Sequence, residues 1–136
     1  MNAELVTIEE TKQETKVRVQ IYYWNRQHID FLMNTTGITI ENLNETHVKV
    51  PTSRPRFVCI GYDPMLDIHN MLEDLFCKYN HEDKNPLGSV NGQKFVRENK
   101  THTSMSVGDV IQINEKYFVC KDEGWRELEK QKLEKT

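Results

Sequence analysis

Apolar and polar residues alternate between positions 16 and 24, and this alternation is the clearest strand signal in the chain. In the run KVRVQIYYW most alternate residues are apolar, which is the period of a strand that buries one face. The other face would carry Arg18, Gln20 and Tyr22. The sequence therefore predicts a strand whose outward side presents polar and aromatic groups.

Short apolar runs at 38–43, 46–50 and 57–60 predict three more strands, because they contain β-branched or aromatic residues and are bounded by turn-forming residues. Residues 25–33 predict a short helix that ends at an Asn-Thr-Thr-Gly turn. Each of these segments is short, so we expect them to pack against a longer element.

The strongest helix signal lies between residues 63 and 80. Asp63 suits the N-cap, where its carboxylate accepts from free amides, and Pro64 suits the first helical position, where an amide would lack a partner. Apolar residues then recur with the helical period and form one stripe. The stripe comprises Ile68, Met71, Leu72, Leu75, Phe76 and Tyr79. We expect this helix to cover a sheet.

The last third of the chain predicts a β-meander. Residues 110–113 and 117–120 are apolar runs joined by Asn-Glu-Lys, and a turn at Gly124 would return Trp125 to the core. Together these features predict an α+β fold. Its mostly antiparallel sheet would be covered by one main amphipathic helix and would end in a C-terminal β-hairpin or meander.

The 136 residues suit one domain with polar ends. Residues 1–14 predict a flexible N-terminal arm, residues 15–128 a single α+β domain, and residues 129–136 a charged tail. Within the domain, residues 81–103 are rich in Asn, Gly and charged side chains and predict a long polar loop. A loop of that length in a small domain is usually functional when it is ordered.

Composition narrows the cellular setting. A formal net charge of −3 gives no general attraction to phosphate backbones, and no run of 18 apolar residues predicts a membrane span. The three cysteines, Cys59, Cys77 and Cys120, lie among hydrophobic residues and are odd in number, which favours reduced core thiols. Because the N-terminus also lacks a basic and apolar leader, the sequence predicts a cytoplasmic protein without membrane contact.

No catalytic, cofactor or metal motif stands out. The chain has no Cys-x-x-Cys or His-x-x-x-His pair for structural zinc, and no Gly-x-Gly-x-x-Gly or Walker loop for a nucleotide. It also has no local signature of an activated nucleophile. We therefore predict a protein that is not an enzyme, has no catalytic or metal-ligating residues and uses no cofactor.

Two groups of residues are candidates for contact with a partner. The first is cationic around one aromatic residue, a mixture that single-stranded nucleic acids favour. It comprises Lys94, Phe95, Arg97, Lys100 and His102. The second is the outward side of the first strand, where Tyr22 and Trp24 would present aromatic rings with polar tips, as interface cores do. The structural alternatives are a solvated loop for the first group and packing under a loop for the second.

Residues 104–125 carry a family resemblance. A helix ending in Leu-Phe and Tyr-Asn is followed by a polar loop, the run SMSVGDV, a Tyr-Phe-Val-Cys strand and a closing Gly-Trp pair. This pattern resembles the YodL-like small domains of bacterial phages, plasmids and the large polyvalent proteins they carry, over about residues 66–128. The residues that carry the motif are Ser104, Ser106, Gly108, Asp109, Gly124 and Trp125. The resemblance implies a mobile-element context.

The same motif also has a structural interpretation. Gly108 can adopt the positive φ of a tight turn, and Asp109 can accept hydrogen bonds from backbone amides across it. Ser104 and Ser106 can cap neighbouring turns.

The resulting hypothesis is a non-enzymatic macromolecule-binding protein of a bacterial mobile element, such as a phage or plasmid counter-defence factor. It would present the 81–103 loop and an aromatic strand face to a host protein. The alternative is a small nucleic-acid-binding domain, because the run VGDVI also resembles a strand start in PUA- or ASCH-type barrels. The two hypotheses predict different effects of salt on binding affinity. The affinity for a nucleic acid would fall steeply as salt rises, because phosphate contacts dominate it, whereas the affinity for a protein would respond weakly. The oligomeric state stays open.

Overall fold

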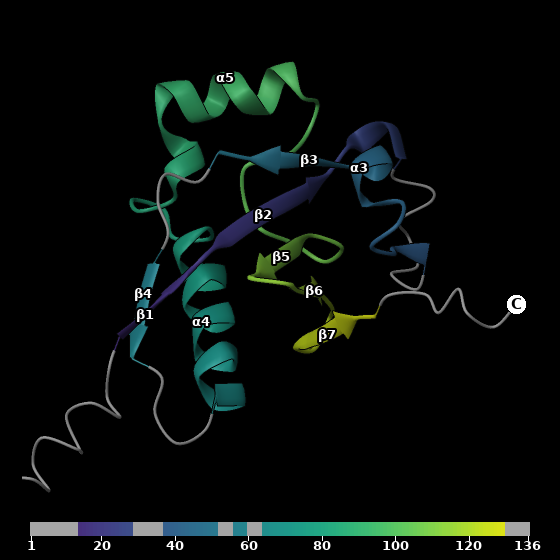
Figure 1. The fold of residues 1–136 in the computed structure, drawn as a ribbon. Coiled ribbons are helices and arrows are strands. Elements are labelled where there is room, and N and C mark those ends of the chain that lie inside the picture. Colours follow the sequence, from purple (N-terminus) through teal and green to yellow (C-terminus); the bar gives the residue numbers. More distant parts are fainter. Residues whose placement is uncertain (1–13, 29–36, 52–55, 60–63, 130–136) are drawn as a thin grey trace, which may run out of the picture.

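The computed structural model describes residues 14–28, 37–51, 56–59 and 64–129 (Figure 1). Its strands are β1 (Glu14–Val17), β2 (Val19–Trp24), β3 (His47–Val50), β4 (Arg56–Cys59), β5 (Val110–Ile113), β6 (Lys116–Cys120) and β7 (Trp125–Leu128). Its α-helices are α3 (Leu43–Thr46), α4 (Pro64–Lys78) and α5 (Val90–Glu98), and its 3-10 helices are η1 (Arg26–His28) and η3 (Pro86–Gly88).

Five strands form one sheet in the order β3-β2-β5-β6-β7, and β1 pairs with β4 in a separate two-stranded sheet. Every pairing is antiparallel. The long diagonal β2 lies between β3 and β5, so its residues face neighbours on both edges (Figure 1). The α+β class and the antiparallel sheet are therefore confirmed.

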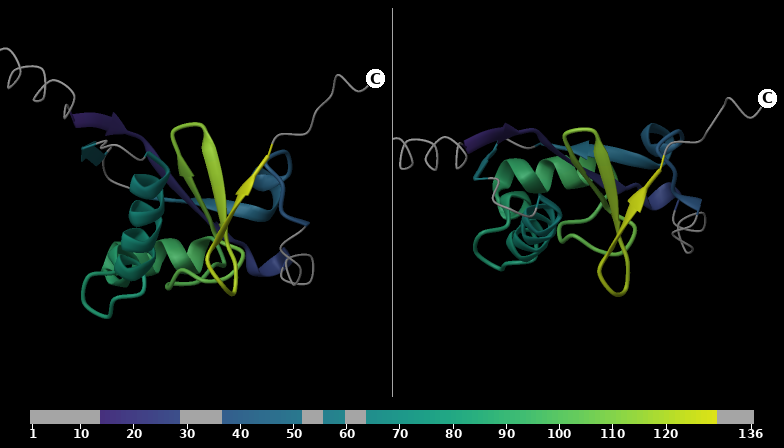
Figure 2. Two further views of the ribbon diagram at one scale, coloured as in Figure 1. Left: turned by 90° about the horizontal axis from the view of Figure 1, so that it is seen from below. Right: turned by 60° about the horizontal axis from the view of Figure 1, so that its bottom comes forward.

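Each face of the five-stranded sheet is covered. One face carries Ile21, Tyr23 and Ile111, which pack with buried residues of α4, η3 and α5 in a single core cluster. The opposite face packs Tyr22, Val110, Val119 and Leu128 against Ile38 and Leu43, from the segment around α3. Figure 2 shows α4 and α5 on one side of the sheet. Burial of apolar surface on both faces is the main stabilising contribution to this fold.

Helix α4 has the predicted amphipathic stripe. Met71, Leu72, Leu75 and Tyr79 are buried, whereas the intervening Glu73 is exposed. The helix begins at Pro64 as predicted, while Asp63 and its N-cap role lie outside the described residues. Phe76 and Trp125 pack edge to face, with ring centroids 6.3 Å apart, and so join α4 to β7. The main helix covers the sheet as expected.

The predicted strand at 38–43 is wrong. Thr39 and Asn42 bond to each other reciprocally, because each backbone N–H donates to the other side chain, at 3.0 and 3.1 Å. The Asn42 amide also donates to the carbonyl of Gly37. These local bonds hold a turn that leads into α3, since Thr and Asn side chains offer the backbone an alternative to a sheet ladder. The strand predicted at 46–50 is confirmed as β3.

The predicted loop at 81–103 is also wrong, because it contains η3 and α5. Asn85 accepts from the N–H of Leu87 at the start of η3, and the hydroxyl of Ser89 accepts from the N–H of Gly92 at the start of α5. Asn85 and Ser89, two of the polar residues that indicated a loop, are thus helix caps. Gly92 allows close packing, since a Cβ there would lie 2.4 Å from the Cα of Leu87.

The C-terminal meander is confirmed, with β5, β6 and β7 as sequential antiparallel neighbours. Gly124 has φ +80° and its carbonyl accepts from the N–H of Lys121, so it closes the predicted turn. Glu14 belongs to β1, whereas the rest of the predicted 1–14 arm lies outside the described residues, as does the tail beyond residue 129. Of the helix predicted at 25–33, only η1 lies within them.

The cysteine prediction holds in part. Cys120 is a buried free thiol, but Cys77 is free and exposed on α4, so it is not a core residue. Position 77 directly follows the apolar stripe residue Phe76, and a helix turns successive residues to different faces. The side chain of Cys59 lies outside the described residues.

Candidate recognition surface on helix α5

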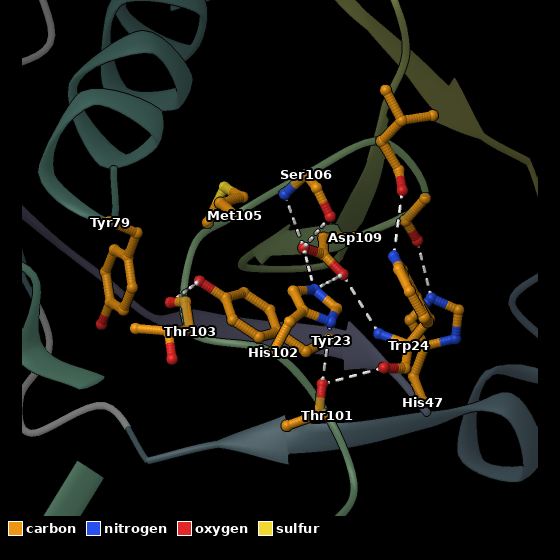
Figure 3. A network of polar contacts seen from close by, with 12 residues as sticks. Tyr23, Trp24, His47, Tyr79, Thr101, His102, Thr103, Met105, Ser106 and Asp109 are labelled. Atoms are coloured by element: carbon orange, nitrogen blue, oxygen red, sulfur yellow. Dashed lines mark hydrogen bonds and ion pairs between the residues drawn. The ribbon is translucent and has the colours of Figure 1, made fainter. Parts of the chain in front are cut away.

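Two places bring functional groups together: a buried polar cluster and the outer side of α5. The polar cluster centres on Asp109 and comprises Tyr23, Trp24, Thr101, His102, Ser106 and Asp109 (Figure 3). Asp109 is fully buried directly before β5. Its carboxylate accepts from the N–H of Ser106 at 2.8 Å, the N–H of Trp24 at 3.1 Å and Nε2 of His102 at 2.7 Å.

The ring of His102 lies between two hydrogen-bonding partners. The hydroxyl of Thr101 donates to the carbonyl of Trp24 at 2.8 Å and lies 3.2 Å from Nδ1 of His102. Nε2 of His102 faces the carboxylate of Asp109 at 2.7 Å. The side chain of His102 is 18% exposed, whereas that of Asp109 is fully buried.

Burial sets the electrostatics of this cluster. Burial raises the pKa of the Asp109 carboxyl above its usual value, and the donors from His102, Ser106 and Trp24 act in the opposite direction. Burial also raises the pKa of the Tyr23 hydroxyl, and the negative charge of Asp109 adds to this effect. The ring of Tyr23 stacks on that of His102, with centroids 4.4 Å apart and planes 5° apart.

The polar cluster is suited to holding the chain together. The cluster joins β2 to the 101–109 segment through bonds of Trp24 to Asp109 and Thr101. No buried side-chain nitrogen or oxygen among the described residues lacks a partner. The geometry thus fits a structural role.

Gly108 and Asp109 have the geometry expected of the predicted turn. Gly108 has φ +95°, and a Cβ there would lie 3.1 Å from the indole of Trp24. Asp109 accepts from the amide of Ser106 across the turn. Ser104 is exposed. The sequence showed the turn but not Thr101 or Tyr23, which no local motif links to Asp109.

The outward aromatic face predicted on β2 is wrong. Tyr22 is 5% exposed, because the segment around α3 covers that side of the sheet. Its hydroxyl donates to Gln112, and burial raises its pKa to about 12. Trp24 is half-buried, with its ring 4.4 Å from that of His102 and its Nε1 donating to the carbonyl of Val107. The structural alternative, packing under a loop, describes both residues.

The cationic group divides in two. Phe95, predicted to be exposed, is partly buried against the core cluster, and His102 belongs to the polar cluster. Lys94, Arg97 and Lys100 are exposed. This division follows the helical period, which turns residue 95 inward and residues 94 and 97 outward. It could not be predicted while this segment was interpreted as a loop.

The outer side of α5 has one further feature that the sequence did not show. Val90 is 85% exposed at the first position of the helix, the largest exposure of a hydrophobic side chain among the described residues. Asn91 is exposed beside it. Glu98 lies 4.0 Å from Lys94, and both side chains are more than half exposed. We call the set Val90, Asn91, Lys94, Arg97 and Lys100 the α5 surface.

Other kinds of site are not found where the structure describes the chain. Within residues 14–28, 37–51, 56–59 and 64–129, no three side chains of His, Cys, Asp or Glu come together in a way that could hold a metal ion. Of the helices described, none is long and apolar enough to cross a membrane.

The fold and these two features define a small α+β protein with an internally paired polar cluster and a solvent-facing, partly cationic helix. The chain is 36% identical over 114 residues to the "Uncharacterized protein R785" of Acanthamoeba polyphaga mimivirus. The match covers 82% of this chain and 93% of the viral protein. The chain therefore belongs to the same family as this viral protein. No family model and no solved structure matches the chain.

Proposed function

We propose that this chain is a non-enzymatic protein-binding factor that contacts its partner through the α5 surface. The observation that carries the proposal is the exposure of Val90 next to exposed Asn91, Lys94 and Arg97 on one short helix. Val90 offers a partner apolar contact, and Arg97 belongs to a residue type that is enriched at protein interfaces. The inner side of the same helix packs on the core through Val96, which fixes its position.

The proposed setting is a virus or mobile element, with a host protein as the partner and counter-defence as the role. The viral origin of the relative supports this setting. The proposed YodL-like resemblance of residues 66–128 points the same way, and that range spans α4 to β7 in the structure. The polar cluster supports a non-enzymatic role, because its hydrogen bonds join β2 to residues 101–109 and so serve the fold.

A nucleic-acid partner is the rival, favoured by the exposed cations Lys94, Arg97 and Lys100. Two observations favour a protein instead. Glu98 partly neutralises Lys94 on the same helix, and Val90 offers apolar contact rather than an aromatic stacking surface. Phe95, the one aromatic ring of α5, packs inward and is not free to stack on bases.

The test replaces Lys94, Arg97 and Lys100 together with Ser and measures retention of host-lysate proteins on the immobilised chain after nuclease treatment. We expect loss of the retained protein with the melting temperature unchanged within about 3 °C, because all three side chains are exposed. The matched control replaces three exposed lysines elsewhere, Lys49, Lys116 and Lys121, and so changes the net charge equally. Equal retention by both variants, or retention that nuclease abolishes, would contradict the proposal.

A further inference from the structure

Lys100 has an unusual backbone conformation. Its φ is +54°, and Asn114 is the other non-glycine residue with positive φ among the described residues. This left-handed region is unfavourable for an L-residue with a long side chain, because the Cβ atom approaches the following carbonyl oxygen. Glycine adopts the conformation without that cost. A lysine at this position therefore needs an explanation.

The conformation arises where α5 ends. The N–H of Thr101 donates to the carbonyl of Val96, and the N–H of Lys100 donates to the carbonyl of Arg97. This pair of bonds is the Schellman motif, in which the residue at the position of Lys100 is most often glycine. The chain thus uses lysine where glycine would be less strained.

Residues at the end of β2 hold the strained turn in place. The N–H of Arg26 donates to the carbonyl of Lys100, and the guanidinium of Arg26 donates to the carbonyl of Thr101 at 2.7 Å. The side-chain amide of Asn25 donates to the carbonyl of Asn99. Three successive carbonyls are therefore fixed from one side, which is the condition under which a strained backbone persists.

The contrast with Asn114 is informative. Asn favours the left-handed region more than other side chains do, and Oδ1 of Asn114 also accepts from the N–H of Arg18 across the sheet. The side chain of Lys100 makes no hydrogen bond or ion pair with any residue in the described part of the chain, and it is exposed. Backbone bonds hold the turn, but among the described residues no contact of the Lys100 side chain offsets the strain.

Positive charge concentrates at this end of α5. Backbone hydrogen bonds join Arg26 to Lys100 and Lys100 to Arg97, and all three residues are exposed. The one acidic side chain of α5, Glu98, lies 4.0 Å from Lys94. A carboxylate group is complementary to these cations, and the exposed Val90 at the other end of α5 favours a protein over a nucleic acid as its source.

We propose that Lys100 determines specificity within the α5 surface: the ammonium group on this strained turn, which backbone bonds join to Arg97 and Arg26, pairs with a carboxylate of an acidic protein partner. The inference rests on the proposed function and names the chemistry of the partner.

The first arm of the test is stability. We expect Lys100→Gly to raise the melting temperature by about 2–4 °C, because glycine removes the strain of positive φ. Lys100→Arg retains the strain and should leave the melting temperature unchanged. If Lys100 instead serves the dipole of α5, Lys100→Gly would lower the melting temperature, and that result would overturn the proposal.

The second arm is binding. The probes are a fluorescent amphipathic peptide of Glu and Leu, the same peptide with Lys for Glu, and a single-stranded RNA of matched negative charge. We expect the wild type to bind the Glu peptide more tightly than the other two probes, with Kd below about 1 mM. Lys100→Gly should weaken this binding about threefold to fivefold and Lys100→Arg should restore it, whereas Lys121→Ser, at a distant exposed lysine, should not change it.

The outcomes separate this proposal from the proposed function. Preference for RNA, absence of peptide binding, or wild-type binding by Lys100→Gly would each overturn the role of Lys100. If a Lys94→Ser/Arg97→Ser variant loses binding while Lys100→Gly keeps it, only this inference fails. If neither change affects peptide binding, and the Ser variants also retain the host protein, the α5 surface itself is excluded.

Discussion

The polar cluster around Asp109 and the α5 surface hold similar groups in opposite states. In the cluster, the carboxylate of Asp109 is fully buried and interacts with Ser106, Trp24 and the partly buried His102. On α5, the cations lie in solvent, and Lys94 has only a loose ion pair at 4.0 Å. Charged residues that are fully paired inside a molecule hold it together. Exposed ones on a fixed helix remain available to a partner.

The largest expected effect comes from breaking the polar cluster. Asp109→Ala removes the acceptor shared by Ser106, Trp24 and His102 and leaves these donors without their partner. Because each unsatisfied buried group costs about 1–3 kcal/mol, we expect the free energy of unfolding to fall by about 2–5 kcal/mol. Urea unfolding at neutral pH measures this loss. A loss below about 1 kcal/mol would show that the cluster does not stabilise the fold.

A smaller effect is expected from displacing α5. In Gly92→Ala the new Cβ would lie 2.4 Å from the Cα of Leu87, so η3 and α5 must move apart. Overpacking of this kind lowers the free energy of unfolding by about 1–3 kcal/mol. The matched control is Gly88→Ala, because nothing lies within 4 Å of a Cβ at that position. Equal thermal stability of the two variants would contradict the packing of η3 on α5.

The smallest expected effect is a dependence of the free energy of unfolding on pH, which comes from a buried thiol. Burial raises the pKa of the Cys120 thiol from 9.0 to about 12, and the negative charges of Asp109, Glu73 and Asp122 add to it. The unfolded thiol ionises first as pH rises, so stability is complete below pH 9 and falls between pH 9 and about 12. At pH 10 the loss is about 1 kcal/mol.

Comparison of unfolding free energies at about pH 8 and pH 10 isolates this contribution. The decrease should be smaller in Cys120→Ala than in the wild type, whatever the stability of the variant at neutral pH. Cys77→Ala serves as the control, because Cys77 is exposed. An equal decrease in the wild type and Cys120→Ala would exclude Cys120 as its source.

Periodicity was sufficient to predict α4, because its apolar residues form one regular stripe, and the apolar runs and turn residues were sufficient to predict β2 and the β5–β7 meander. It failed at 38–43 and 81–103, where Asn, Ser and Thr side chains decide the backbone. Hydrogen bonds between Thr39 and Asn42 form a turn where a strand was predicted. Ser89 caps the start of α5, a helix whose polar composition had indicated a loop. The pattern of apolar residues does not show whether side-chain hydrogen bonds to the backbone will favour a helix or a turn over a strand.

The candidate site was predictable only in part. Lys94, Arg97 and Lys100 are exposed as expected, but helical phase turned Phe95 inward, and tertiary packing covered Tyr22. His102 differs again, because its partner Asp109 follows a turn that only the folded chain places beside β2. Pairings that depend on tertiary structure leave no signal in the local sequence.

Site-specific photo-crosslinking tests the central claim most directly. A benzophenone side chain is placed at Asn91 on the α5 surface or at Glu123 in the β6–β7 turn, both exposed positions. The two proteins are irradiated in nuclease-treated host lysate. We predict a discrete protein adduct from position 91 that the Lys94/Arg97/Lys100→Ser variant loses, and no such adduct from position 123. Equal adducts from both positions, or an adduct from position 123 alone, would contradict recognition through α5.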